Sequence, residues 1–171
     1  KDLVVGSTAV VVGAGLMISL KDKNDINLKA RNYEYFFNRA QDKFELADYE
    51  EAILDYNKAL ELSPTEICLV YSMRGNAKRN LGDFDGAISD QNKALDFDPL
   101  YADGYFNRGS AKYKMGDFAG AIEDYTQVIK INPKDSDAFF NRANIKKEIG
   151  DMRGACEDWK KGAELGDEDA E

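Results

Sequence analysis

The chain has 171 residues, of which 23 are Lys or Arg and 32 are Asp or Glu, so its formal net charge is −9. This length suits one domain with a short appendage, and the acidity argues against nucleic acid as a partner, because phosphate binding requires a basic surface. The sequence contains no histidine and only two cysteines. These absences exclude serine–histidine triads and histidine-ligated metals, and they predict a protein that is not an enzyme and needs no cofactor.

A charge-free segment lies near the start of the chain, from Leu3 to Leu20. As a helix, its 18 residues would span about 27 Å, close to the roughly 30 Å of a bilayer core. We therefore expect residues 1–21 to form a single transmembrane anchor helix. Four basic side chains follow within residues 21–31 and only one precedes the segment. The excess of positive charge predicts that the following domain lies on the cytoplasmic or stromal face, joined by a basic linker at 22–31.

Other interpretations of this segment compete with the anchor. A cleavable secretory leader would have a shorter apolar core. The run VVVGAG suggests the start of a dinucleotide-binding fold, but Ile18 occupies the third glycine position and no βαβ pattern follows. A core helix of a water-soluble protein would show a polar face. Within an anchor, the small residues Ala9, Gly13 and Gly15 either pack against another membrane helix or are merely tolerated.

The rest of the sequence is a repeat. Four alanines, Ala52, Ala87, Ala121 and Ala155, follow one another at intervals of 35, 34 and 34 residues. Pairs of Gly and Asp at 82–83, 116–117 and 150–151 keep the same phase, as do the three prolines. Within a repeat, apolar residues recur at helical spacing, Gly ends one helix, Asp caps the next and Pro closes it. A period of 34 residues predicts stacked pairs of helices.

Four motifs in phase resemble the tetratricopeptide repeat (TPR) family over residues 32–171, with repeats at 33–66, 68–101, 102–135 and 136–169. The resemblance implies an all-α fold, a right-handed TPR superhelix of four helix-turn-helix repeats after the N-terminal transmembrane helix. The pattern NRGxAKxxxGDFxGAIxDxxxAI is similar to that of TPR proteins of cyanobacteria and plastids. Family members bind proteins in a concave groove lined by the first helix of each repeat.

The resemblance also implies which residues line that groove. Their amides and aromatic rings suit an extended peptide. They are Phe37, Asn38, Gln41, Asn76, Arg79, Phe106, Asn107, Tyr113, Phe140, Asn141 and Asn144. The recurring Arg39, Arg74, Arg108 and Arg142 fit either the groove or the scaffold. The family's clamp for chaperone C-terminal tails requires basic residues where Ser72, Asp137 and Asn141 stand, so we expect no such tail as partner.

We therefore expect a membrane-anchored TPR scaffold that binds protein partners and assembles or stabilises a membrane complex. The resemblance to cyanobacterial and plastid TPR proteins suggests a photosynthetic complex in the thylakoid. The alternative is a soluble TPR adaptor whose leader is cleaved.

Overall fold

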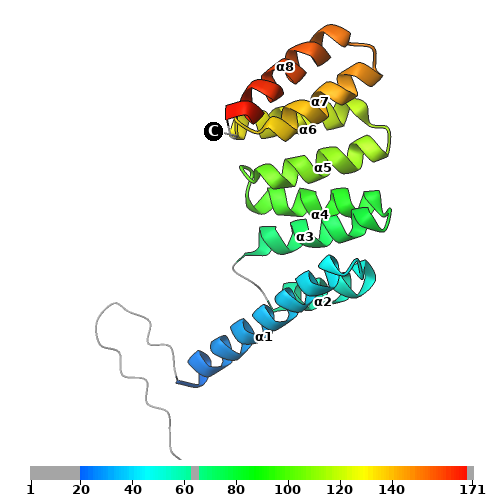
Figure 1. Ribbon diagram of the computed structural model, residues 1–171. Coiled ribbons are helices and arrows are strands. Elements are labelled where there is room, and N and C mark those ends of the chain that lie inside the picture. The colour runs from blue at the N-terminus through cyan, green and yellow to red at the C-terminus, as the bar shows by residue number, and fades with distance from the viewer. Residues whose placement is uncertain (1–19, 63–65, 169–171) are drawn as a thin grey trace, which may run out of the picture.

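The computed structural model describes residues 20–62 and 66–168. Figure 1 shows their helices stacked as successive antiparallel pairs, in chain order from α1 to α8. The helices of this part of the chain are α1 (Leu20–Glu45), α2 (Tyr49–Glu61), α3 (Ile67–Asn80), α4 (Phe84–Phe97), α5 (Ala102–Lys114), α6 (Phe118–Ile131), α7 (Ser136–Glu148) and α8 (Met152–Glu168). The predicted all-α stack of four helix pairs is confirmed.

The Gly–Asp pairs make the turn inside each of the last three helix pairs. Gly82, Gly116 and Gly150 have φ angles of 84°, 82° and 87°, a left-handed conformation that glycine adopts without strain. The aspartate that follows caps the next helix: Asp83 Oδ1 accepts a hydrogen bond from the Gly86 backbone N–H at 2.9 Å. The first helix pair differs, because Ala47 takes the positive φ and Asp48 makes no side-chain cap.

Small residues allow the two helices of each pair to touch. The four alanines that define the repeat are at most 1 % exposed. Opposite Ala121, a Cβ added to Gly109 would lie 3.4 Å from the Ala121 carbonyl oxygen, so the helices meet almost backbone to backbone. The larger core side chains gather between consecutive pairs instead, in one cluster across α1, α2 and α3 and another across α6 and α7. The core therefore forms by stacking of repeats.

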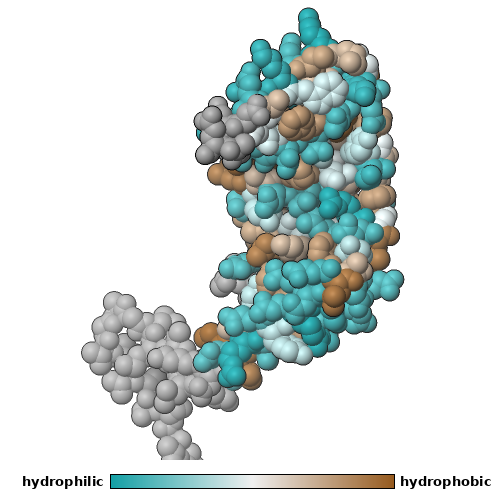
Figure 2. Space-filling view, in the orientation of Figure 1, coloured by the Kyte–Doolittle hydropathy of each residue, from teal (hydrophilic) through white to brown (hydrophobic). Residues whose placement is uncertain are grey.

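The start of α1 differs from the sequence expectation. Residues 22–31, expected as a linker, form the first turns of α1. They contain neither Pro nor Gly, so nothing in this segment ends a helix. Residues 1–19 of the expected anchor, with Ala9, Gly13 and Gly15, lie outside the described residues. Within 20–62 and 66–168, no helix has an apolar stretch long enough to cross a membrane. Hydrophilic side chains cover most of the face in Figure 2, with scattered hydrophobic ones.

Candidate protein-binding groove

A buried aspartate on each second helix is held by two cations from the first helix of its pair. Asp124 accepts hydrogen bonds from Arg108 Nε at 3.0 Å and Nη2 at 2.6 Å, and it lies 2.9 Å from Lys112 Nζ. The arrangement recurs in every repeat, and we call it the Asp–Arg–Lys ladder. Its other members are Asp55 with Arg39 and Lys43, Asp90 with Arg74 and Lys78, and Asp158 with Arg142 and Lys146.

The ladder carboxylates are only 1–6 % exposed, and each lies against two cations. Hydrogen bonds, first from Arg39 and then from Lys43, hold the pKa of Asp55 below its ordinary 3.8 against the opposing effect of burial. Burial is the largest single influence on the pKa of Asp158 and would raise it, but the bonds from Arg142 and Lys146 together outweigh burial and lower the pKa. A buried charge of this kind persists only with its partners in place.

The ladder arginines belong to the scaffold. Each guanidinium lies over the ring of an aromatic residue three positions earlier, for example 5.3 Å from Tyr105 to Arg108 and 5.6 Å from Phe139 to Arg142. The stacking and the two bonds to aspartate fix the side chain. The recurring arginines fitted either the groove or the scaffold from sequence, and these contacts support the scaffold role.

The remaining nitrogen of the arginine joins neighbouring repeats. Nη1 donates to a polar side chain on the second helix of the preceding repeat, in the pairs Arg74 with Asn57, Arg108 with Asn92 and Arg142 with Thr126, at 2.6, 2.6 and 3.0 Å. Nη1 of Arg39 donates instead to Tyr35 of its own helix at 2.9 Å. In the fourth repeat, Lys160 occupies the position of the acceptor, and an ammonium group cannot accept a hydrogen bond.

Three of the predicted groove residues bond the first helices of successive repeats. Arg79 Nη1 donates to Ser110 Oγ at 2.9 Å, and Asn107 Nδ2 donates to Ser72 Oγ at 3.3 Å. The Tyr113 hydroxyl donates to Glu148 at 2.5 Å, and this bond is the main reason why the pKa of Tyr113 is raised. These contacts fix α3, α5 and α7 relative to one another, so this wall of the groove is formed before any ligand arrives.

Two of the predicted aromatic anchors, Phe37 and Phe106, pack into the core, and a third, Phe140, is more exposed. Phe37 is 9 % exposed, with its ring centroid 6.1 Å from that of Tyr56. Phe106 packs edge-on against Tyr125 at 5.3 Å. Phe140 is 37 % exposed, although its ring lies against Gly162 of α8. Phe37 and Phe106 therefore contribute mainly to core packing, whereas part of the Phe140 ring remains exposed to solvent.

Two predicted asparagines meet at a small pocket between α5, α6 and α7. The pocket has a volume of about 70 Å³ and is lined by Tyr113, Tyr125, Asn141, Asn144 and Ile145. Asn141 uses one N–H on the Asp137 carbonyl of its own helix at 2.8 Å, which leaves its side-chain oxygen for a ligand. The Asn144 oxygen accepts from Trp159 Nε1 at 3.2 Å, which leaves its NH₂ group. The pocket thus offers both an acceptor and a donor.

The remaining predicted groove residues lie on α1 and α3, the first helices of repeats one and two. Asn38 is exposed and Gln41 is half-buried, both on α1. Asn76 on α3 is half-buried, and its side-chain oxygen is buried without a hydrogen-bond partner among the described residues. In the described residues, α1 makes no side-chain hydrogen bond to α3 like those that join α3 to α5.

Sequence reasoning assigned no role to the aspartates of the ladder, although the repeat pattern contains them. Asp55, Asp90, Asp124 and Asp158 recur at intervals of 35, 34 and 34 residues, so their phase was a visible signal. The phase alone did not indicate a buried ion pair, because aspartates in an acidic chain are usually solvated surface. Trp159 on α8 is half-buried, and its indole N–H donates to Asn144. Among residues 20–62 and 66–168, no group of three or more His, Cys, Asp or Glu side chains is placed to hold a metal ion.

The described helix pairs place this chain among the helical-repeat proteins. Comparison of its sequence with protein families identifies the family. Tetratricopeptide repeat families match residues 33–66, 102–135 and 124–157, and a TPR repeat family matches 75–116. The chain belongs to the tetratricopeptide repeat family. No curated protein sequence is significantly similar to it.

Solved structures share the fold at low sequence identity. The crystal structure of MamA superposes with a TM-score of 0.76 at 22 % identity, covering 91 % of this chain and 99 % of that chain. The first TPR of Spaghetti (RPAP3), bound to the HSP90 peptide SRMEEVD, gives 0.66 at 24 % identity, with 70 % and 94 % covered. The Arabidopsis OM64 TPR domain gives 0.67 at 20 % identity, with 70 % and 98 % covered. At these identities the likeness concerns the fold alone.

Proposed function

We propose that this protein is a scaffold that binds an extended segment of a partner protein along the first helices of its repeats. One observation carries the proposal: the pocket between Tyr113, Tyr125, Asn141, Asn144 and Ile145. Its two asparagines offer an acceptor and a donor, which is what one peptide unit of an extended chain needs. The pocket is too small for most cofactors and suits one small side chain or a turn of backbone.

The rigid wall beside this pocket supports peptide binding. The bonds Arg79–Ser110, Asn107–Ser72 and Tyr113–Glu148 hold the first helices before binding, so little ordering entropy is lost on association. The proposed partner is not a chaperone tail. Ser72, where the clamp would need a cation, is buried and accepts a bond from Asn107.

The second element of the proposal is a place at a membrane. The charge-free segment Leu3–Leu20 would hold the repeats close to the bilayer, with the repeats on the cytoplasmic or stromal face. Such a scaffold would assemble or stabilise a membrane complex, and the resemblance to cyanobacterial and plastid TPR proteins makes a photosynthetic complex the first to examine. The competing proposal is a soluble adaptor with a cleaved leader.

A photo-crosslinking residue at position 144 tests the groove. In native extract it should capture one protein, and a crosslinker at Gln127 on α6, a second helix, should not. With Asn141→Ala and Asn144→Ala combined, we expect affinity for that protein to fall by about 2 kcal/mol, roughly 30-fold, at unchanged helical circular dichroism. Equal capture from both positions, or unchanged affinity of the double variant, would remove the groove from the proposal.

Membrane fractionation with an alkaline wash tests the anchor. We expect the intact chain to remain in the pellet, and a variant with Val10→Lys and Val12→Lys to move to the supernatant, because each charge at mid-helix costs about 3 kcal/mol. Release of the unaltered chain by the wash would favour the soluble adaptor.

A further inference from the structure

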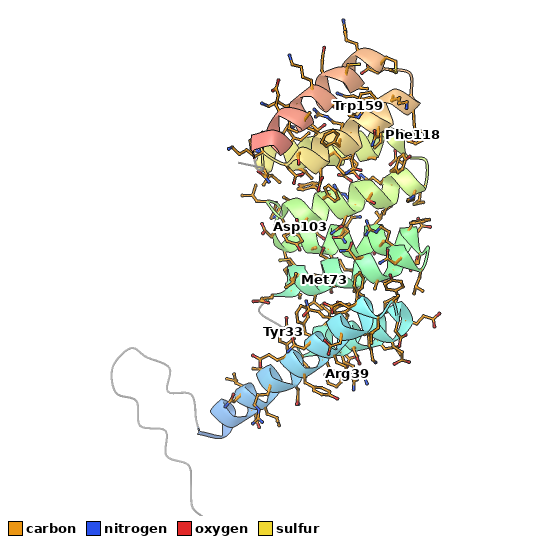
Figure 3. The ribbon with its side chains drawn as sticks, in the orientation of Figure 1. Tyr33, Arg39, Met73, Asp103, Phe118 and Trp159 are labelled. Carbon is orange, nitrogen blue, oxygen red and sulfur yellow. The ribbon has the colours of Figure 1, made fainter. Side chains whose placement is uncertain are left out.

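A second, larger pocket lies at the first junction of the array, between α1 and the start of α3. Its volume is about 450 Å³, and its lining consists of Ala30, Tyr33, Glu34, Phe37, Asn38 and Glu66. Glu66 is the residue that precedes the first turn of α3. Figure 3 shows Tyr33 on the side of α1 toward α3. The pocket includes Phe37 and Asn38, which are positions of the groove, so it continues the proposed binding surface.

The two carboxylates of this pocket are available to a ligand. Glu34 and Glu66 are exposed, and neither forms an ion pair with any described residue. The contrast with the ladder is plain, because each ladder aspartate is held by an arginine and a lysine. The pocket therefore carries two negative charges that nothing in the described part of the chain neutralises.

Aromatic surface lies beside the carboxylates. The rings of Tyr33 and Phe37 are stacked, with centroids 5.7 Å apart and planes at 25°. The Tyr33 hydroxyl is buried and lacks a hydrogen-bond partner among the described residues. Burial first, and then the charges of Glu66 and Glu34, raise the pKa of Tyr33, which places both carboxylates near this hydroxyl. Aromatic faces next to anions attract a cation with an apolar stem.

The competing ligands fit less well. An anion would meet two negative charges. A metal ion would find two carboxylates, and no group of three or more ligating side chains exists in the described part of the chain. An apolar side chain would leave both charges unpaired, whereas a lysine or arginine supplies a cation for the carboxylates, a donor for the Asn38 amide oxygen and an apolar stem for the rings.

We propose that this pocket receives a lysine or arginine side chain of the partner segment bound in the groove. The inference rests on the proposed function and adds its specificity: the partner carries a basic residue at the end of the segment that lies over the first repeat. Two exposed acids, Asp103 on α5 and Asp137 on α7, occupy the same repeat position as Glu34, so this edge of the groove favours basic sequence.

The pocket can be tested without the partner. The full chain is titrated with N-acetyl-arginine methylamide and with N-acetyl-lysine methylamide, and the tyrosine ring signals are followed by NMR. We expect saturable shifts of Tyr33, with the citrulline and norleucine analogues at least about tenfold weaker. In the variant Glu34→Gln with Glu66→Gln, the basic probes should weaken by a similar factor. The control variant Glu123→Gln with Glu157→Gln, which removes the same charge from exposed second-helix positions, should bind as the unaltered chain does.

A second measurement separates this inference from the groove itself. Peptides are selected from a displayed library of random sequences by the full chain, and each basic residue of the best binder is replaced by norleucine. We expect one replacement to cost about tenfold in the unaltered chain and less than about twofold in Glu34→Gln with Glu66→Gln. Binders that lack basic residues, or equal losses in both proteins, would overturn the basic-residue pocket while leaving the groove intact. If the amide probes fail to shift Tyr33, the pocket is likewise excluded, whatever the peptides show.

Discussion

Each ladder aspartate is a charge that folding removes from water, and its Arg and Lys partners compensate for that cost. Removing one aspartate therefore leaves two cations without their counter-ion. For Asp124→Ala we expect a loss of about 3 kcal/mol in the free energy of unfolding, at the lower end for a broken buried pair, because Arg108 and Lys112 still reach solvent at 19 % exposure.

Urea unfolding followed by circular dichroism measures this loss. The matched control is Asp96→Ala, an exposed aspartate of α4, which should change the free energy of unfolding by less than about 0.5 kcal/mol. If both substitutions lower the free energy of unfolding equally, the ladder ion pairs contribute no more than an exposed aspartate, and our account of them is wrong.

The same residues set the acid limit of the fold. The pKa of Asp55 and Asp158 is lower in the folded chain than the ordinary 3.8, so the unfolded chain binds protons first as the pH falls. Their stabilising contribution is complete above about pH 4 and is lost progressively as the pH drops through 3.8 toward the folded values. Urea midpoints between about pH 6 and pH 2.5 should therefore decline on the acid side.

The variant Asp55→Asn with Asp158→Asn provides the comparison. It should be less stable near neutral pH and should depend less steeply on pH below about 4, because it lacks two of the groups that take up protons on unfolding. An identical acid slope in the two proteins would assign the decline to other carboxylates.

At the scale of the element, the capped turn inside each of the last three helix pairs has a Gly three residues after the capping Asp. A Cβ on Gly86 would collide with the Asp83 carboxylate, and the equivalent holds for Gly120 and Gly154. In the first pair Glu51 stands at this position, and Asp48 makes no cap. Inside the helix pairs the cap and the glycine therefore occur together, whereas at the start of α7, between two pairs, Asp135 caps the backbone N–H of Ala138.

This dependence predicts a reversal of sign. Asp83→Ala should cost about 1 kcal/mol through the lost cap. Gly86→Ala should destabilise the unaltered chain, but in the Asp83→Ala background it should stabilise by about 0.5–1 kcal/mol, because alanine suits a helix better than glycine. Urea or thermal unfolding of the unaltered chain, Asp83→Ala, Gly86→Ala and the double variant measures the coupling between the two positions as a double-mutant cycle. The same sign for Gly86→Ala in both backgrounds would contradict it.

The elements were the part of this structure most open to prediction from sequence. Left-handed glycine at 82, 116 and 150 and the small residues at the helix crossings each follow from a local rule, so four helix pairs could be read directly. The start of α1 could not, because charged residues such as Lys23 and Lys29 are as compatible with a helix as with a linker. At the groove, helical phase located the candidate residues but could not show that Phe37 is buried by Tyr56.

At the scale of the whole molecule, the junctions between repeats are unequal. Among the described residues, repeats two and three are joined by Arg108–Asn92, Arg79–Ser110 and Asn107–Ser72, whereas repeats one and two are joined by Arg74–Asn57. Tyr56 on α2 and Asn76 on α3 also bury polar atoms without partners among those residues. Among the described residues, the first junction thus has the fewest side-chain hydrogen bonds between repeats.

Hydrogen exchange followed by mass spectrometry should detect this inequality. We expect amides of α2 to exchange faster than those of α4 and α6, because opening of the first repeat breaks fewer side-chain hydrogen bonds to the next repeat. Asn57→Leu should accelerate α2 further, and Asn92→Leu should mainly affect α4 and α5. Uniform protection across the four repeats would show that the array opens as one unit.

The bond from each arginine to the repeat before it also decides which repeats can trade places. Repeats two and three each present an acceptor, Asn92 or Thr126, and each carry an arginine, so swapping them preserves all three arginine–acceptor contacts. The fourth repeat presents Lys160 and would set two cations against each other if moved to an inner slot. Shuffled arrays should therefore tolerate it inside only after Lys160→Asn, so a single side chain governs the permitted order of the modules.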